Sequence, residues 1–258
     1  ADLSRFDDAA AVAGYAASAV RWANADGLMT GRTEALLVPK GTTNRAEYAA
    51  LLQRYSTAAV PTVASTLTDE VAALVAAQTP NPTVASVGGE WAVVGIARSG
   101  AAMPANYAET YYQNLTNVLT AQNGTLSTTR LTDYARVILA LSAIGRNPAD
   151  AAGYNLLAPL GDEDAVTRQG VNGVIYALIA LDSGNYTLPD GSSASRDGYV
   201  SKLLSLQLDD GGWALTGSAA DPDLTAMALQ ALAPYRSANT QVQRAVERGI
   251  AALSALQN

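Results

Sequence analysis

The sequence of 258 residues contains no cysteine, no histidine and a single phenylalanine. The absence of cysteine excludes a disulfide, a thiolate zinc site and a cysteine nucleophile from these residues. The absence of histidine excludes a Ser-His-Asp triad and a histidine metal site. Any acid–base chemistry must therefore use Asp, Glu, Lys or Tyr side chains.

Positive charge is also scarce, because 16 basic residues face 23 acidic ones and the formal net charge is −7. Nucleic-acid binding needs a cationic surface, so we expect no nucleic-acid partner. No stretch approaches the roughly 20 apolar residues of a membrane span. The N-terminus shows no signal-peptide pattern, as expected of a mature or trimmed chain.

What the sequence does contain is an internal repeat. Apolar helical runs end at Gln78, Gln122, Gln207 and Gln257, at intervals of 44, 85 and 50 residues. The middle interval is close to twice the first, so one repeat end has no such glutamine, and its expected position is near residues 158–161. A repeat of roughly 45 residues accommodates two helices and two turns, and it must stack on its neighbours to bury its apolar face.

The apolar periodicity predicts helices in two layers. Outer helices are expected at 68–78, 106–122, 151–160, 195–207 and 240–257. Inner helices, which are apolar on most sides, are expected at 89–99, 131–144, 169–182 and 222–234.

The first 57 residues do not share this period. They predict a helix over 10–26, with Val12, Tyr15, Ala19 and Trp22 on one apolar face, and a second helix over 44–54. Asn44 and Glu47 form a capping-box-like pair at the start of the second helix. Residues 58–67, which contain one proline and no charge, are expected to be a linker.

This N-terminal segment resembles an S-layer homology motif, a cell-wall anchoring module of bacterial surface proteins. The resemblance rests on Phe6-Asp7-Asp8, residues 19–23, residues 26–31, Pro39, residues 43–48 and residues 51–55. It implies that Trp22 and Arg45 face an anionic, pyruvylated wall polysaccharide, and arginine makes forked bonds to carboxylates. The alternative is that Trp22 belongs to the core and Arg45 is a surface or packing residue. The family usually uses three motifs that share grooves, whereas this sequence has one.

A second resemblance starts from the spacing Gln207-x3-Gly211-x-Trp213. It is similar to the QW motif of the squalene-cyclase and prenyltransferase-repeat superfamily, and it covers about residues 66 to 258. The resemblance implies an α/α toroid in which Gln207, Gly211 and Trp213 are structural. Glutamine at a helix end can satisfy unpaired backbone groups, which agrees with that role.

The same repeat contains Asp221 and Asp223 at the start of an inner helix. Triterpene cyclases of the superfamily have Asp-x-Asp-Asp there, and the middle Asp protonates the substrate. Here Leu224 replaces the last Asp, and one Phe with three Trp is a poor lining for a carbocation cavity. The alternative is that Asp221 and Asp223 cap the helix and complement its dipole. The zinc site of protein prenyltransferases and the thioester of other toroid proteins require residues that this sequence lacks.

Other polar residues mark the starts of the inner helices. Together they predict a polar ring around a central funnel, the default ligand site, although each also suits a helix cap. These candidate ligand-binding residues are Glu90, Trp91, Asp133, Tyr134, Gln169, Asn172 and Asp223, with Arg168 beside them. Asp162-Glu163-Asp164 is compatible with calcium or with a solvated acidic turn, and we predict no metal site.

The sequence thus predicts an all-α chain with an S-layer-homology-like segment at 1–57, a linker at 58–67 and an incomplete or open toroid at 68–258. The predicted hairpins do not close a ring, so we expect a fragment of a longer protein or an open toroid.

Three functions remain open. The first is a non-catalytic, wall-associated module that binds a small or oligomeric ligand through the toroid. The others are an enzyme acting on isoprenoids or polysaccharides with Asp223 as acid, and a structural spacer. We expect an extracellular, cell-surface location, wall polysaccharide and a small molecule as partners, and no cofactor. A cobalamin-like ligand is implied by resemblance only, because cobalamin carriers share the toroid.

Overall fold

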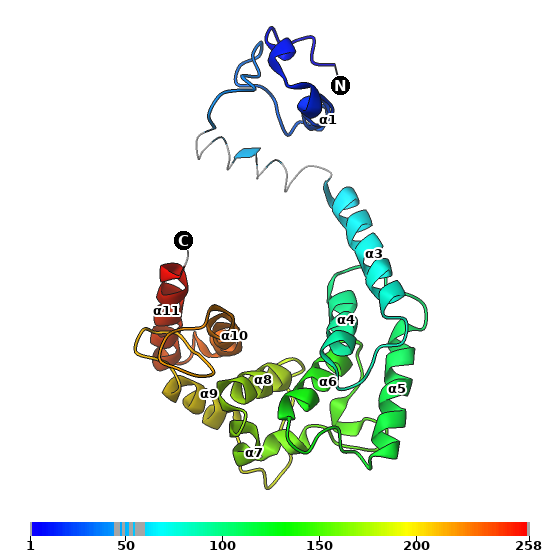
Figure 1. Cartoon of the computed structure of the whole chain (residues 1–258), viewed down its shortest axis with the longest axis vertical. Coiled ribbons are helices and arrows are strands. Elements are labelled where there is room, and N and C mark those ends of the chain that lie inside the picture. The colour runs from blue at the N-terminus through cyan, green and yellow to red at the C-terminus, as the bar shows by residue number, and fades with distance from the viewer. Residues whose placement is uncertain (1, 44–46, 48–49, 52–53, 55–59, 257–258) are drawn as a thin grey trace. The chain divides into compact units, whose positions relative to one another are not determined.

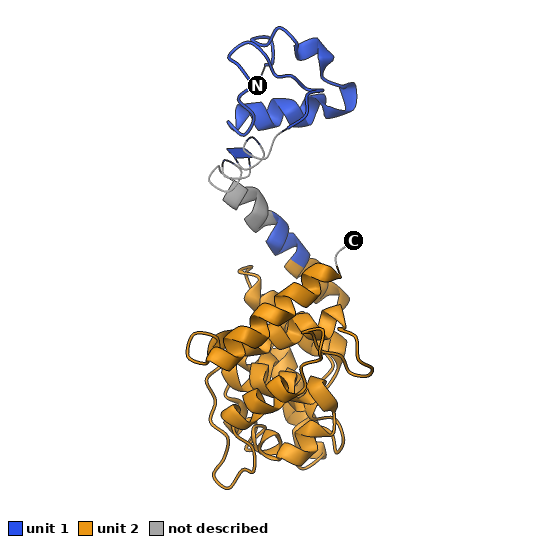
Figure 2. Ribbon diagram, turned by 90° about the vertical axis from the view of Figure 1, so that its left-hand side faces the viewer, with its two compact units in different colours: residues 1–71 blue, residues 72–258 orange. Residues whose placement is uncertain are grey.

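The computed structural model describes residues 2–43, 47, 50, 51, 54 and 60–256. The chain divides into two compact units, residues 1–71 (unit 1) and residues 72–258 (unit 2) (Figure 2). The described residues are helical with no β-strand, as the sequence predicts for an all-α protein. None of the helices in this described part combines the length and the hydropathy of a membrane span.

Unit 1 has short helices around a small core. The elements are the 3-10 helices η1 (Ala9–Ala11) and η2 (Gly14–Ala16) and the α-helix α1 (Ala17–Ala25). Leu3, Phe6 and Leu37 are buried, and Ala9, Val12 and Val20 pack against them. The single phenylalanine of the sequence thus lies at the centre of this core.

The prediction of a continuous helix over 10–26 is wrong in its first half, where 3-10 turns replace the α-helix. The predicted apolar face is wrong as well, because Tyr15, Ala19 and Trp22 are exposed. Val20 and Ala23 point inward instead. Most of the predicted helix over 44–54, including Asn44 and Arg45, lies outside the described residues.

The helix α3 (Val60–Gln78) begins earlier than expected. Residues 60–67, assigned to a linker from their composition, are therefore helical. Pro61 lies in the first turn, where a missing backbone N–H costs nothing. The run of Ala, Val, Thr and Leu that follows contains no glycine and no further proline to interrupt the helix.

Unit 2 is built from helices in two layers (Figure 1). The inner helices pack in succession, α4 on α6, α6 on α8 and α8 on α10. They are α4 (Val87–Arg98), α6 (Leu131–Ala143), α8 (Gly170–Asp182) and α10 (Pro222–Leu232). Their predicted positions are confirmed to within about two residues.

The outer layer is less regular. It contains α5 (Tyr107–Ala121), η3 (Pro148–Asp150), η4 (Ala158–Gly161), α7 (Glu163–Thr167), α9 (Arg196–Ser205) and α11 (Thr240–Ala255), whereas the 3-10 turn η5 (Ala233–Tyr235) directly follows the inner helix α10. The outer helices predicted at 106–122, 195–207 and 240–257 are confirmed. The one predicted at 151–160 is wrong, because Ala152 and Gly153 take left-handed conformations and residues 151 and 154 pair in a tight turn.

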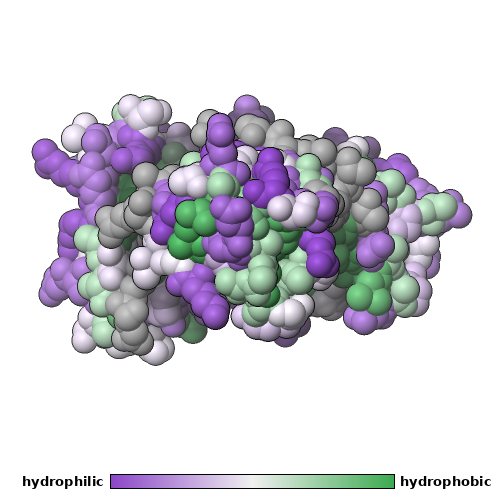
Figure 3. Space-filling view, turned by 90° about the horizontal axis from the view of Figure 1, so that it is seen from above, coloured by the Kyte–Doolittle hydropathy of each residue, from purple (hydrophilic) through white to green (hydrophobic). Residues whose placement is uncertain are grey.

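The core of unit 2 consists of a large cluster between these layers and a smaller one that includes Val93 and Ile96 of α4 and Tyr111 of α5. Leu115 and Leu119 of α5, Ile138 and Leu141 of α6 and Leu178 of α8 are fully buried in one cluster. Figure 3 shows one face of the molecule, on which hydrophobic side chains lie in patches among hydrophilic ones.

Candidate functional site

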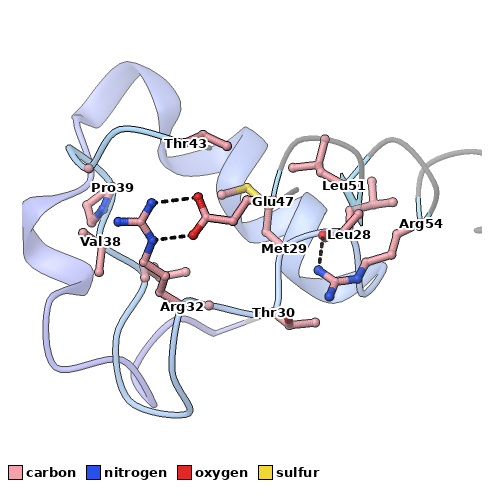
Figure 4. A pocket seen from close by; sticks show the side chains of 14 residues that line it. Leu28, Met29, Thr30, Arg32, Val38, Pro39, Thr43, Glu47, Leu51 and Arg54 are labelled. Atoms are coloured by element: carbon pink, nitrogen blue, oxygen red, sulfur yellow. Dashed lines mark hydrogen bonds and ion pairs between the residues drawn. The ribbon is translucent and has the colours of Figure 1, made fainter. Parts of the chain in front are cut away.

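A pocket of about 320 Å³ lies in unit 1, in the segment that follows α1 (Figure 4). Leu28 and Leu37 are buried and form an apolar floor. Polar and charged side chains lie around them. The lining residues are Leu28, Met29, Thr30, Gly31, Arg32, Leu37, Val38, Pro39, Gly41, Thr43, Glu47, Ala50, Leu51 and Arg54.

Local backbone geometry shapes this pocket. Gly31 has φ +89°, and a Cβ there would lie 2.6 Å from the carbonyl oxygen of Thr33 and 2.7 Å from the Phe6 ring, so only glycine fits. Asp8 fixes the backbone of two lining residues, because its carboxylate accepts hydrogen bonds from the N–H groups of Leu37 (2.8 Å) and Val38 (2.7 Å). These bonds favour the charged form and lower the pKa of Asp8.

An ion pair lies at the pocket (Figure 4). Arg32 donates from Nε to Oε1 of Glu47 at 2.9 Å and from Nη2 to Oε2 at 2.9 Å, and Nη2 also donates to the carbonyl oxygen of Thr42. This forked geometry raises the pKa of Arg32. Both side chains are more than a third exposed, so the pair adds little stability but fixes the orientation of both groups.

Among the described residues that line the pocket, the charged ones are Arg32, Arg54 and Glu47, so basic side chains outnumber acidic ones there by one. Arg54 Nη1 donates to the carbonyl oxygen of Leu28 at 3.4 Å, a weak bond at the pocket wall. An apolar floor beside guanidinium groups suits a small anionic group that carries apolar atoms.

Among the wall-polymer candidates, Trp22 is 46% exposed on α1 and is therefore not a core residue. Arg45 lies outside the described residues. Glu47, which the sequence pairs with Asn44 in a capping-box-like arrangement, is described, and it forms an ion pair with Arg32.

In unit 2 most of the candidate ligand-binding residues form hydrogen bonds or ion pairs within the protein. Glu90 is completely buried at the start of α4. Its carboxylate accepts bonds from the backbone N–H groups of Ala85 (2.9 Å) and Ser86 (2.7 Å) and from the Tyr111 hydroxyl (3.0 Å). Burial raises the pKa of Glu90 to about 7, although the Tyr111 hydroxyl, the backbone bonds and Arg136 act in the opposite direction.

Arg136 links Glu90 to Asp133. Its Nε lies 3.9 Å from Oε2 of Glu90, and its Nη2 donates to Oδ1 of Asp133. Asp133 is 2% exposed and also accepts a bond from Arg130 Nε at 2.9 Å. Arg136 Nε itself is buried without a hydrogen-bond partner in the described structure. Glu90 and Asp133 are therefore brought together, around a cation that sequence analysis did not single out.

The candidates near the start of α8 contact α6. Gln169 accepts a bond from the backbone N–H of Thr132 (3.0 Å) and donates to its hydroxyl (3.2 Å). Tyr134 is buried, and its hydroxyl accepts from the N–H of Leu126. Asn172 differs from them, because its Oδ1 atom is buried without a partner among the described residues.

At α10 the two aspartates have different surroundings. Asp221 caps the helix by accepting a bond from the N–H of Leu224 at 2.8 Å, and Asp223 is exposed in the first turn. Trp91 on α4 is 41% exposed. Arg168, the remaining candidate, follows α7 as its C-cap residue.

The QW-like residues join α9 to α11. Gln207 Nε2 donates to the carbonyl oxygens of Gly211 (2.7 Å) and Ala245 (2.8 Å). Trp213 is completely buried, and its indole N–H donates to the carbonyl oxygen of Leu203 at 2.8 Å. Gly211 has φ +95°, and a Cβ there would lie 2.7 Å from the backbone of Arg248. These contacts support a structural role.

Asp162 begins the short helix α7, where its carboxylate accepts a bond from the N–H of Ala165 at 2.9 Å. Glu163 and Asp164 follow in the first turn. The residues that the structure describes contain no group of three or more acidic side chains placed to hold a metal ion.

Sequence analysis missed Arg32, Tyr111 and Arg136. The strongest signal was Arg136, a charged residue inside the apolar run of an inner helix. The pairings themselves join residues 15, 21 and 46 positions apart, and no local pattern reports them.

A family model for the S-layer homology domain matches residues 5–49, which include α1 and most of the pocket lining. Comparison with curated proteins and with solved structures gives no match. The chain thus carries an S-layer homology domain, and this identifies it as a bacterial protein of the cell surface or cell wall.

Proposed function

We propose that this protein is a non-catalytic surface module that unit 1 attaches to an anionic cell-wall polysaccharide. The observation that carries the proposal is the pocket lined by Arg32, Glu47 and Arg54, most of whose described lining lies in the S-layer homology segment at residues 5–49. A pocket with guanidinium groups beside an apolar floor is suited to a sugar that carries a carboxylate and a small apolar group.

Arg32 and Arg45 of this segment have different expected roles. Arg32 is neutralised by Glu47, so we expect it to hold the pocket in shape. Arg45, by resemblance to the family, is expected to meet the carboxylate of the polymer.

Co-sedimentation of the full chain with purified cell walls tests this function. Walls that carry their polysaccharide should retain the protein, and walls stripped of it by acid should not. Arg45→Ala should lower retention at least tenfold, which corresponds to about 1.4 kcal/mol. Arg98→Ala, an exposed arginine of unit 2, is the matched control and should bind like the parent.

Exchanging Arg32 and Glu47 tests whether this ion pair only holds the pocket in shape or also contacts the polymer. A variant with Glu at 32 and Arg at 47 preserves the pair and should retain binding if the pair is structural. Equal retention of the parent on both kinds of wall would refute anchoring through the polysaccharide.

For unit 2 we propose an open α/α toroid that binds a ligand at the N-terminal ends of its inner helices. The unpaired Oδ1 of Asn172 and the exposed Trp91 support this second function. Because Glu90, Asp133 and Gln169 are already bonded, ligand binding there would depend on the remaining groups. A thermal-shift screen against wall glycans, cobalamins and prenyl compounds tests it, and a shift that Asn172→Ala does not change would refute this site.

The enzyme alternative has less support. A proton donor of the cyclase type needs a buried acid above an apolar cavity. Asp223 is exposed and Asp221 is occupied as a cap. Turnover of a squalene-like substrate that disappears in Asp223→Asn would favour the enzyme.

A further inference from the structure

The backbone of Val38, a residue that lines the pocket of unit 1, is strained. Its φ is +55°, in the left-handed region that β-branched residues avoid. The next residue is Pro39, and a proline pushes the residue before it toward extended angles. At the other non-glycine positions with positive φ in the described part of the chain, the residue is Asn, which tolerates this region, or Ala, which has no branch at Cβ.

Three hydrogen bonds hold this conformation. The Asp8 carboxylate accepts from the N–H groups of Leu37 and Val38, and the carbonyl oxygen of Val38 accepts from the N–H of Gly41 at 2.9 Å. Strained residues persist where their surroundings fix them in this way, and they cluster at functional sites. A glycine at position 38 would adopt the same backbone without strain. The valine side chain therefore needs a reason of its own.

The core of unit 1 does not supply that reason. Leu37 belongs to the buried cluster around Phe6, whereas Val38 is not among the described side chains that form this cluster or pack against it. Val38 is also only partly buried. Folding of unit 1 thus gains less from its side chain than from that of Leu37 beside it.

The side chain of Val38 lies at the pocket, close to the ion pair (Figure 4). A Cβ atom on Gly41 would lie 2.7 Å from Cγ1 of Val38 and 2.9 Å from Nη1 of Arg32, so this methyl group and the guanidinium group border the same small space. Val38 also lines a neighbouring hollow of about 340 Å³ that includes Ala11 and Lys40. Val38 thus extends the apolar surface of the pocket floor up to the charged groups.

We propose that Val38 is a specificity-determining residue of the pocket, and that its strained backbone holds its isopropyl group against the apolar part of the ligand. This inference rests on the anchoring function proposed above. It selects a sugar whose carboxylate stands beside a small alkyl group over a uronic acid, whose carboxylate has no alkyl neighbour. A methyl-sized contact in an apolar pocket changes affinity by about tenfold or more.

Titration calorimetry of the full chain with two soluble polymers tests this role. One polymer is the wall polysaccharide, and the other is polygalacturonate, whose carboxylates carry no alkyl group. The parent should bind the wall polysaccharide at least about tenfold more tightly. Val38→Thr keeps the branched shape and the strained backbone but replaces a methyl group with a hydroxyl, so it should lower this preference.

Val38→Gly separates the strain from the side chain. It should abolish the preference, because the isopropyl group is gone. Its melting temperature should not fall, because the relief of strain offsets the greater freedom of glycine in the unfolded chain. A residue with a purely structural role would not give this combination of lost selectivity and retained stability.

Ala152→Gly is the matched control. Ala152 also has a positive φ, of 53°, and it lies exposed in a turn of unit 2. The substitution relieves strain of the same kind but removes no side chain from the pocket. It should leave the affinity for both polymers unchanged.

The outcomes distinguish this inference from the anchoring function. If the parent binds the wall polysaccharide and both Val38 variants keep its preference, Val38 is not the selective contact and anchoring stands. If the parent binds neither polymer, both proposals are wrong. If Val38→Gly loses the preference and melts lower than the parent while Val38→Thr binds like the parent, Val38 only shapes the loop and the specificity role is overturned.

Discussion

Unit 2 should become less stable as the pH rises through neutrality, and Glu90 should be the cause. Burial raises the pKa of Glu90 from its ordinary 4.5 to about 7 in the folded protein. The folded state therefore binds this proton more tightly than the unfolded state does. The resulting stability is fully present below pH 4.5 and is lost as the pH rises through about 7.

The size of the effect follows from the same values. The interval between 4.5 and about 7 corresponds to about 3 kcal/mol of unfolding free energy. Solvent does not reduce this free energy by screening the charge, because Glu90 is completely buried. Domains are typically stable by about 5–15 kcal/mol, so the change should be easily measured.

Urea unfolding between pH 5 and pH 8.5, followed by tryptophan fluorescence, is the assay. Glu90→Gln keeps the shape and most of the hydrogen-bonding groups but cannot ionise, so its stability should vary little over this range. Glu109→Gln provides the matched control, because Glu109 is about half exposed and pairs with Arg146 at the surface. A parent whose stability does not fall, or a Glu90→Gln variant that falls as steeply as the parent, would refute this assignment.

Other substitutions in unit 2 probe its packing and its buried charges. Trp213→Ala should lower the unfolding free energy by about 3–5 kcal/mol, since it removes a large buried ring, and wall retention in a co-sedimentation assay should stay unchanged below the melting temperature. Arg136→Leu should cost about 3–5 kcal/mol in urea unfolding, because it leaves the carboxylates of Asp133 and Glu90 buried without their shared cation. A loss below 1 kcal/mol in either variant would contradict the corresponding contact.

The inner helices of unit 2 could be predicted from the sequence because their apolar runs are long and uninterrupted. Where the signal was short, prediction failed. At 151–160 the composition suits a helix, but left-handed backbone at Ala152 and Gly153 turns the chain. At residues 60–67 the absence of charge suggested a linker, although the same absence is compatible with the first turns of α3.

The candidate site was harder to predict than the fold. The predicted polar residues do lie at the N-terminal ends of the inner helices. Their positions in the sequence do not show whether each side chain faces a ligand site or forms hydrogen bonds within the protein. Glu90 and Gln169 are bonded within the protein because the first turns of adjacent helices leave backbone N–H groups and polar side chains within reach. In unit 1 the sequence motif identified the S-layer homology segment. It could not predict the two hydrogen bonds from Arg32 to Glu47, because these depend on the fold of the loop that follows α1.

These contacts bear on where recognition takes place. A ligand at the inner-helix ends would have to compete with hydrogen bonds that already satisfy buried groups, and each bond broken there leaves an unpaired group in a poorly solvated place. In unit 1 the situation is reversed, because a ligand can enter the pocket beside the Arg32–Glu47 pair without opening the core. The physical cost of binding is therefore lower in unit 1, which favours anchoring as the primary role of this chain.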